Sequence, residues 1–148
     1  IPATYIQDER QKIEMYKRIR SIDSMETYHE LLDDFIDRFG EFPDEVSYLL
    51  EVGMIKYFAE QLSITSIKKK QYSIIVSIAQ PVAQQLEGVA IFEALGPVKL
   101  PAQVTKKGTT LQVLLNVTNQ PTDLWLEQIK IFLEKCCEVV EVQKEENE

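Results

Sequence analysis

Residues 33–62 constrain the fold of this chain most strongly, because they read as two helices joined by a tight corner. The first of these helices is predicted to stop at Gly40, since glycine adopts the backbone conformation that ends helices. Pro43 disfavours helical geometry at the residue before it, and Asp44 is a suitable N-cap for a second helix over residues 45–62. Acidic side chains collect at the same corner. The corner is therefore both a folding landmark and a candidate contact surface.

The length and composition are those of a globular domain with its own core. The chain has 148 residues, of which 45% are hydrophobic and 27% charged. The net charge of −8 argues against a nucleic-acid-binding surface spread over the whole domain, but it allows a local basic patch. No signal peptide and no apolar run near the roughly 20 residues of a membrane span is present, so we expect no membrane contact. Because the chain begins at Ile1 without a methionine, we expect a fragment of a larger multidomain protein.

Three helices are predicted in the first part of the chain. The first begins after an Asp8 cap and runs to about Ile22, and the second covers residues 25–39 after a Ser24 cap. The corner described above leads into the third. We therefore predict a single domain made of a lead-in, a helical part, an α/β part and an acidic, frayed tail, over residues 1–7, 8–62, 63–137 and 138–148.

The second predicted helix carries its acids on the side opposite its apolar seam. Its acidic residues are Glu26, Glu30, Asp33, Asp34 and Asp37. Glu30, Asp34 and Asp37 keep a four- and three-residue spacing, so their carboxylates are expected to line up along one side. Acids close to a helix C-terminus oppose the helix dipole, which Arg38 partly offsets. Two interpretations stay open: plain solubility, and an ion-pairing surface for a basic partner.

The apolar period changes from helix to strand at Ile64. The predicted order is strand, strand, helix, strand, strand, helix, over residues 64–70, 71–79, 81–95, 98–104, 111–117 and 122–137. The last helix is predicted to bury Trp125, Ile129, Phe132, Leu133 and Cys136. The expected fold class is α+β, with three N-terminal helices followed by a small, mostly antiparallel sheet that has helices packed on it. The pairing between the two hairpins stays open.

The sequence carries no recognisable catalytic or metal-binding motif. It has no glycine-rich phosphate loop and no nucleophile elbow, and His29 is its only histidine. The two cysteines, Cys136 and Cys137, are adjacent, so they neither pair readily with each other nor complete a tetrahedral zinc site. They read as reduced, with Cys136 in the core. We therefore expect no catalytic residue, no bound cofactor and no metal in this chain.

Two groups of cations suggest an alternative role in contacting DNA. Five basic residues surround the first predicted helix, namely Arg10, Lys12, Lys17, Arg18 and Arg20. Lysines also gather at the predicted hairpin turns, over residues 68–70 and 106–107. Either group could meet a phosphate backbone, but a solvated helix face and soluble turns account for the same pattern.

Several short strings in the sequence resemble one protein family. These are Ile1-Pro2, the run Asp-Glu-Arg-Gln-Lys at 8–12, Tyr-Lys-Arg at 16–18, the string Asp-Arg-Phe-Gly-Glu-Phe-Pro at 37–43 and Leu-Leu at 49–50. Together they closely resemble the C-terminal domain of the bacterial transcription-repair coupling factor, the Mfd family. The resemblance is strong over the N-terminal helices and looser over the two hairpins and the last helix.

The resemblance implies a regulatory domain of a cytoplasmic, ATP-dependent DNA translocase that acts in transcription-coupled nucleotide excision repair. Such a parent displaces RNA polymerase stalled at DNA damage and recruits the damage sensor UvrA. ATP and Mg²⁺ would be bound elsewhere in the parent, so this fragment would not be an enzyme. In the family, the C-terminal domain packs against an intramolecular UvrB-like module, covers its UvrA-binding surface and restrains the motor.

The resemblance also implies which residues meet that module. Family members use acids within and just before the Asp-Arg-Phe-Gly string to pair with arginines of the UvrB-like module. By position these acids match Asp34 and Asp37. The predicted interface also includes the neighbouring Asp33, Arg38 and Glu41.

Overall fold

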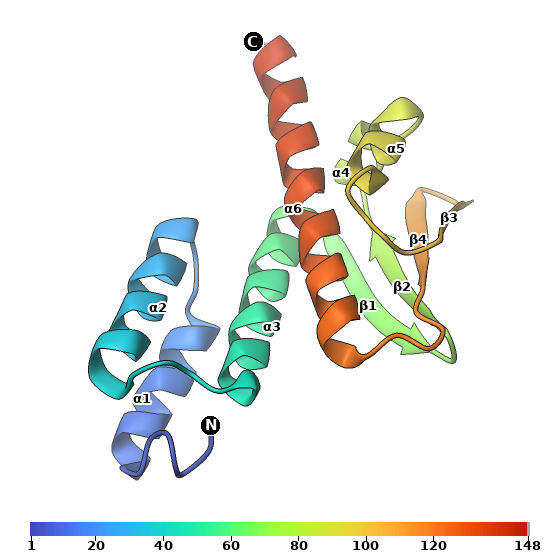
Figure 1. The fold of residues 1–148 in the computed structure, drawn as a ribbon. Coiled ribbons are helices and arrows are strands. Elements are labelled where there is room, and N and C mark those ends of the chain that lie inside the picture. Colours follow the sequence, from blue (N-terminus) through green and yellow to red (C-terminus); the bar gives the residue numbers. More distant parts are fainter. Residues whose placement is uncertain (148) are drawn as a thin grey trace. The chain divides into compact units, whose positions relative to one another are not determined.

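The computed structural model describes residues 1–147 and confirms the α+β fold class. Within these residues it shows six helices and a four-stranded antiparallel sheet (Figure 1). The chain divides into two compact units, Ile1–Tyr57 and Phe58–Glu148. Among the residues that the structure describes, none of the helices combines the length and the hydropathy of a membrane span.

The first unit contains α1 (Glu9–Arg20), α2 (Met25–Phe39) and most of α3 (Asp44–Gln61). The predicted caps of the first two helices are confirmed. The Asp8 carboxylate accepts hydrogen bonds from two backbone N–H groups of the first turn of α1, at 2.8 and 3.1 Å. Ser24 forms a capping box at the start of α2.

Two helix boundaries of the first unit differ from the prediction. Helix α1 ends at Arg20 rather than at Ile22. Helix α3 begins at Asp44 itself, so Asp44 is its first residue and not its N-cap. The reason is that the carbonyl of Pro43 already accepts the first hydrogen bonds of α3, from the backbone N–H groups of Val46 and Ser47. In this first turn the positive end of the helix dipole still stabilises the Asp44 carboxylate.

The buried residues of the first unit come from all three helices. They include Met15 and Ile19 of α1, Leu31 and Phe35 of α2, and Val46 and Leu50 of α3. The apolar seam predicted for α2, which is Met25, Tyr28, Leu32, Phe35 and Phe39, is only partly confirmed: Phe35 is buried, but Met25 keeps 39% of its surface exposed.

The second unit is built on a sheet whose strand order is β1-β2-β4-β3. The strands are β1 (Ile64–Lys70), β2 (Ser73–Ile78), β3 (Ala102–Lys107) and β4 (Thr110–Asn116), and every neighbouring pair is antiparallel. The two hairpins therefore join through β2 and β4. This arrangement settles the pairing that the sequence left open.

The core of the second unit follows a cross-strand stripe on one face of the sheet. Three residues of β2 stand opposite three of β4, in the pairs Ile74–Leu115, Val76–Val113 and Ile78–Leu111, and all six are buried. Such directly opposed apolar pairs are the main stabilising unit of an antiparallel sheet. Polar residues occupy most of the alternate positions, as period-two alternation requires.

The predicted helix over residues 81–95 is two short helices, α4 (Val82–Gln85) and α5 (Val89–Leu95). Gly88 separates them with a φ of +72°, which is a left-handed conformation that a helix interior does not accept. Both short helices pack against α6 (Thr122–Asn147).

Helix α6 starts at Thr122, but its C-terminal end and the burial of Trp125 differ from the prediction. The predicted fraying from residue 138 is wrong for the part that the structure describes, because Val139 and Val140 are buried and the helix continues to Asn147. Trp125 is half-buried rather than buried, whereas its neighbour Leu126 is buried. The other predicted core positions of this helix, including Cys136, are confirmed as buried.

Candidate functional site

The corner between α2 and α3 is held in place by the N-terminal lead-in. The Tyr5 hydroxyl donates to the Gly40 carbonyl at 2.7 Å and also lies 3.3 Å from the Phe35 carbonyl oxygen. The Tyr5 ring lies 5.9 Å from the Phe39 ring and 6.3 Å from the Phe35 ring, while Phe42 meets Phe35 edge-on at 6.4 Å. Burial raises the pKa of the Tyr5 hydroxyl. These contacts fix the C-terminal end of α2, where the predicted site lies.

Four acids form an exposed row along α2. Glu26, Glu30, Asp33 and Asp37 follow one another at spacings of four, three and four residues, and all four are exposed. At roughly 100° per residue they fall within about 60° of one another around the helix axis. We call these four residues the acidic stripe.

Asp34 follows Glu30 by four residues and borders this stripe, as the predicted spacing of Glu30, Asp34 and Asp37 requires, but its carboxylate is engaged within the first unit. Its carboxylate forms an ion pair with Arg18 of α1 and lies 3.8 Å from the Arg38 guanidinium. It is turned toward α1 and is only half-exposed. Periodicity within one helix could not reveal this pairing, because the pairing depends on how α1 packs against α2.

Arg38 connects the same network to the aromatic corner. Its guanidinium pairs with Glu14 of α1 at 3.2 Å and lies 5.1 Å from the centre of the Phe39 ring. Sequence reasoning missed Arg18 and Glu14 as part of this network. The one sequence feature that could have indicated this network is the group of basic residues on the first helix, to which Arg18 belongs.

The five predicted interface residues are thus not equivalent. Asp34 and Arg38 lie together in the ion-pair network. Asp33, Asp37 and Glu41 are exposed, and the structure shows no ion pair to any of the three among the residues it describes. This arrangement can present negative charge to a partner.

The described residues present no cluster that could form a metal centre. No group of three or more His, Cys, Asp or Glu side chains within them could hold a metal ion. His29 is exposed on α2, beside the Tyr28 ring at 5.5 Å. The Cys136 thiol is buried, and this burial raises its pKa, which makes it a poor nucleophile.

The lysines of the second unit gather on the sheet. Residues 61–86 and 94–122, which include all four strands, contain six lysines and no acid. Lys68 to Lys70 are the last residues of β1, and Lys106 and Lys107 are the last of β3, so they precede the turns. By register, Lys68, Lys70 and Lys107 share the sheet face opposite the buried stripe. Lys106 is already paired with Glu87 at 2.5 Å.

Comparisons with known proteins agree on one family. A sequence model of the TRCF domain matches residues 1–89. The chain is 35% identical to the transcription-repair-coupling factor of Bacillus subtilis over 129 residues, and 35% identical to that of Staphylococcus haemolyticus over 147 residues. These matches cover 87% and 99% of the chain, but only 11% and 12% of the two relatives.

One solved structure is similar to this chain in both fold and sequence. It is a crystal structure of the C-terminal domain of transcription-repair coupling factor, and it superposes with a TM-score of 0.88 at 34% identity. The match covers 96% of this chain and 88% of the other.

Proposed function

Because this chain belongs to the TRCF domain family, we propose that it is a regulatory interaction domain of a DNA translocase in transcription-coupled nucleotide excision repair. The domain covers the UvrA-binding surface of a UvrB-like module in the same protein and restrains the motor until RNA polymerase engages. The chain spans 11 to 12% of the length of the relatives that it matches, so the ATP- and Mg²⁺-dependent chemistry is assigned to other parts of the parent.

The observation that supports this role most directly is the acidic stripe at a rigid corner. Its carboxylates are exposed and regularly spaced, and the Tyr5 contacts hold the end of the helix that carries Asp37. Ion pairs at an exposed surface contribute about 0–1 kcal/mol each, so a contact made of a few is weak and sensitive to salt. Tethering within one protein compensates through a high effective concentration. A latch needs this combination, because a modest competing interaction can open it.

Asp34 and Asp37 have different parts in the proposed latch. Asp37 is open to an incoming arginine. At Asp34, a partner arginine must share or displace Arg18 and Arg38. We therefore assign the first contact to Asp37, and assign to Asp34 a contact that forms when its internal partners rearrange.

Charge reversal in the full-length protein tests this proposal. The double variant Asp34→Lys with Asp37→Lys should release the UvrB-like module and raise the affinity for UvrA. The matched control is Asp123→Lys with Glu127→Lys, which reverses two exposed acids of α6. If the first variant binds UvrA no more tightly than the parent, these residues do not form the latch.

A second candidate function, contact with DNA, rests on the lysines of the sheet. Lys68, Lys70 and Lys107 share one face, and the strands that carry them contain no acid. Helix α1 supports this role less, because Arg18 pairs with Asp34 and Lys12 lies 3.8 Å from the Glu9 carboxylate. A salt titration with duplex DNA decides between the candidates, since phosphate contacts weaken steeply as salt increases. Absence of binding at low salt excludes this second candidate.

A further inference from the structure

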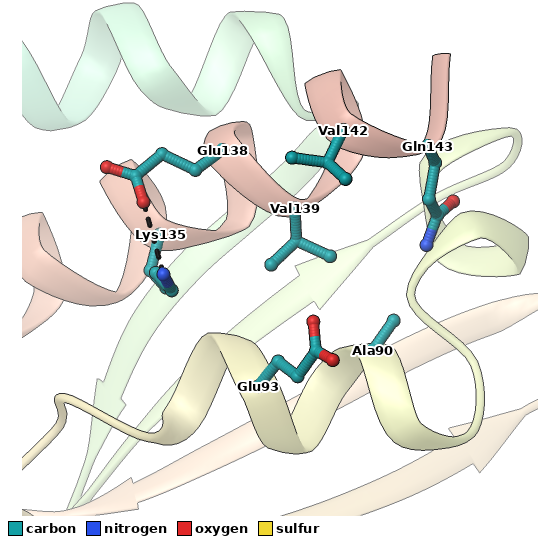
Figure 2. A pocket seen from close by; sticks show the side chains of 7 residues that line it. All are labelled: Ala90, Glu93, Lys135, Glu138, Val139, Val142 and Gln143. Carbon is teal, nitrogen blue, oxygen red and sulfur yellow. Dashed lines mark hydrogen bonds and ion pairs between the residues drawn. The ribbon is translucent and has the colours of Figure 1, made fainter. Parts of the chain in front are cut away.

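Two hollows adjoin along α6, far in sequence from the acidic stripe. The first, of about 380 Å³, lies between α5 and α6 and has Ala90 and Glu93 on the α5 side (Figure 2). The second, of about 290 Å³, is lined in part by Pro97 and Ile131. Both hollows are lined by Lys135 and Glu138, so they are neighbours along α6, and we call the two together the groove.

The groove follows a single face of α6 over three turns. The α6 residues that line it are Ile131, Glu134, Lys135, Glu138, Val139, Val142 and Gln143, which is the spacing of one helix face. Between Ile131 and Gln143 the helix rises by about 18 Å, at roughly 1.5 Å per residue. The opposite wall keeps a comparable spacing, with Ala90, Glu93 and Pro97. One end is fixed by a hydrogen bond of 2.7 Å from the Gln143 amide to the Gln85 carbonyl.

The groove has apolar side chains inside and acidic side chains at its edges. Val139 and Val142 project from α6 toward Ala90 (Figure 2). Val142 keeps 52% of its surface exposed, although Val139 and Val140 beside it are buried. Among the lining residues that the structure describes, the acids are Glu93, Glu134 and Glu138, and the one lysine, Lys135, is bonded to Glu138 at 3.2 Å. The lining therefore carries a net negative charge.

The apolar surface continues over the outside of α5. Val89 and Phe92, three residues apart on this helix, are 74% and 68% exposed. An exposed phenylalanine and valine beside an apolar groove extend the area that a partner could bury. The groove and these two side chains form what we call the α5–α6 surface.

We propose that the α5–α6 surface is a docking site for a basic amphipathic helix of another protein. An apolar stripe with i, i+3/i+4, i+7 spacing on a three-turn helix matches the length of the groove, and flanking Lys or Arg residues would meet Glu93 and Glu134. The negative lining disfavours nucleic acid. A second copy of this chain is also disfavoured: its one strongly basic helix among the described residues is α1, which buries Met15 and Ile19 and leaves only Ile13 as a large exposed aliphatic side chain, too few for an apolar stripe of three turns.

A display selection with the 148-residue chain tests this proposal. The probe is a library of helix-forming peptides of about 12 residues with randomised positions. Enriched peptides should be basic and amphipathic. Val142→Lys should weaken their binding by about tenfold or more, because it places a positive charge in the groove that repels a basic peptide. The control is Val52→Lys, which alters a valine of the first unit with a similar exposure of 50%. This control should leave binding unchanged.

Several outcomes would overturn the proposal. The surface does not bind a basic amphipathic helix if the enriched peptides are acidic or non-helical. The same holds if they bind the Val142→Lys variant as tightly as the parent. The same conclusion follows if no peptide is enriched. Sedimentation of the chain alone supplies a further test: a dimer that Val142→Lys dissociates would identify a second copy as the occupant.

Discussion

The two units of this chain differ in how they place charge. Residues 1–57 have 13 acidic and seven basic side chains, a formal charge of −6, whereas residues 58–148 have 11 acidic and nine basic, a formal charge of −2. In the first unit, five acids lie on α2 alone. In the second, the lysines lie largely on the sheet and the acids on the helices. The overall charge of −8 therefore conceals two distinct charge distributions, and the first includes the acidic stripe of α2.

The two units also differ in what holds them together. The first depends on helix caps and on a ring cluster in which Phe35 is the shared member, since Tyr5, Phe39 and Phe42 all contact it. The second depends on the buried cross-strand stripe between β2 and β4. If this contrast is correct, damage to the ring cluster should act on the first unit.

The largest expected effect is that of Phe35→Ala. Phe35 is fully buried, and truncation of a buried phenylalanine costs about 3–5 kcal/mol of unfolding free energy. The measurement is urea unfolding followed by far-ultraviolet circular dichroism. The emission of Trp125, the only tryptophan, reports on the second unit in the same experiment and should change less.

Phe132→Ala is the matched variant in the second unit, since Phe132 is also fully buried. It should shift the Trp125 transition strongly. If the two variants shift both signals equally, the units unfold as one cooperative structure and the contrast between them does not extend to their stability.

A smaller effect is expected for Gly40→Ala at the corner. Gly40 has φ +85° and ψ −170°, a conformation that is almost exclusive to glycine, so an alanine there should cost about 1–3 kcal/mol. Nothing lies within 4 Å of the added Cβ, so the cost comes from the backbone alone. Thermal unfolding measures it. A variant as stable as the parent would show that the corner relaxes, and would weaken the case for a rigid platform beneath Asp37.

The features that could be predicted from the sequence are those decided by neighbours along the chain. The Ser24 cap, the stop at Gly40 and the alternation in β2 depend on local chemistry, and all three are present. The features that failed depend on contacts between segments distant in sequence. Arg18 finds Asp34 only when α1 and α2 pack, and Val139 extends α6 only because it is buried.

The same division between local and distant contacts applies to the candidate site. The acidic character of α2 follows from its composition, and the family resemblance indicated Asp34 and Asp37. The division between a paired Asp34 and an open Asp37 needed the tertiary structure. The α5–α6 surface was not predicted at all, because each helix alone has an ordinary pattern and the groove exists only between them.

A third prediction concerns Cys136 in the second unit and the dependence of stability on pH. Burial, with a smaller contribution from the Cys137 thiol, raises the pKa of the Cys136 thiol above its ordinary value of 9.0. The unfolded chain loses this proton near pH 9 while the folded chain keeps it. The contribution of this thiol to the free energy of unfolding is therefore fully present below pH 9. As the pH rises above 9, the free energy of unfolding should fall by up to about 1.4 kcal/mol per pH unit.

Urea unfolding at pH 7, 9 and 10 measures this dependence, with Cys136→Ala as the variant that removes it. Cys137→Ala is the control, since Cys137 is only half-buried. A decline between pH 9 and 10 that is the same in Cys136→Ala and the parent would show that other groups cause it.

The smallest expected effects are coupling energies, which distinguish ion-paired acids from open ones. A double-mutant cycle between Arg18→Gln and Asp34→Asn should give a coupling of about 0.5–1 kcal/mol, and so should a cycle between Lys106→Gln and Glu87→Gln in the second unit. A cycle between Arg18→Gln and Asp37→Asn should give a coupling near zero. Asp37→Asn alone should leave unfolding unchanged, yet it should weaken binding to the UvrB-like module, because Asp37 is assigned the first contact. If Asp37 instead couples to Arg18, both acids are engaged within the first unit, and the open carboxylates that distinguish this unit would be reduced to those of Glu26, Glu30 and Asp33.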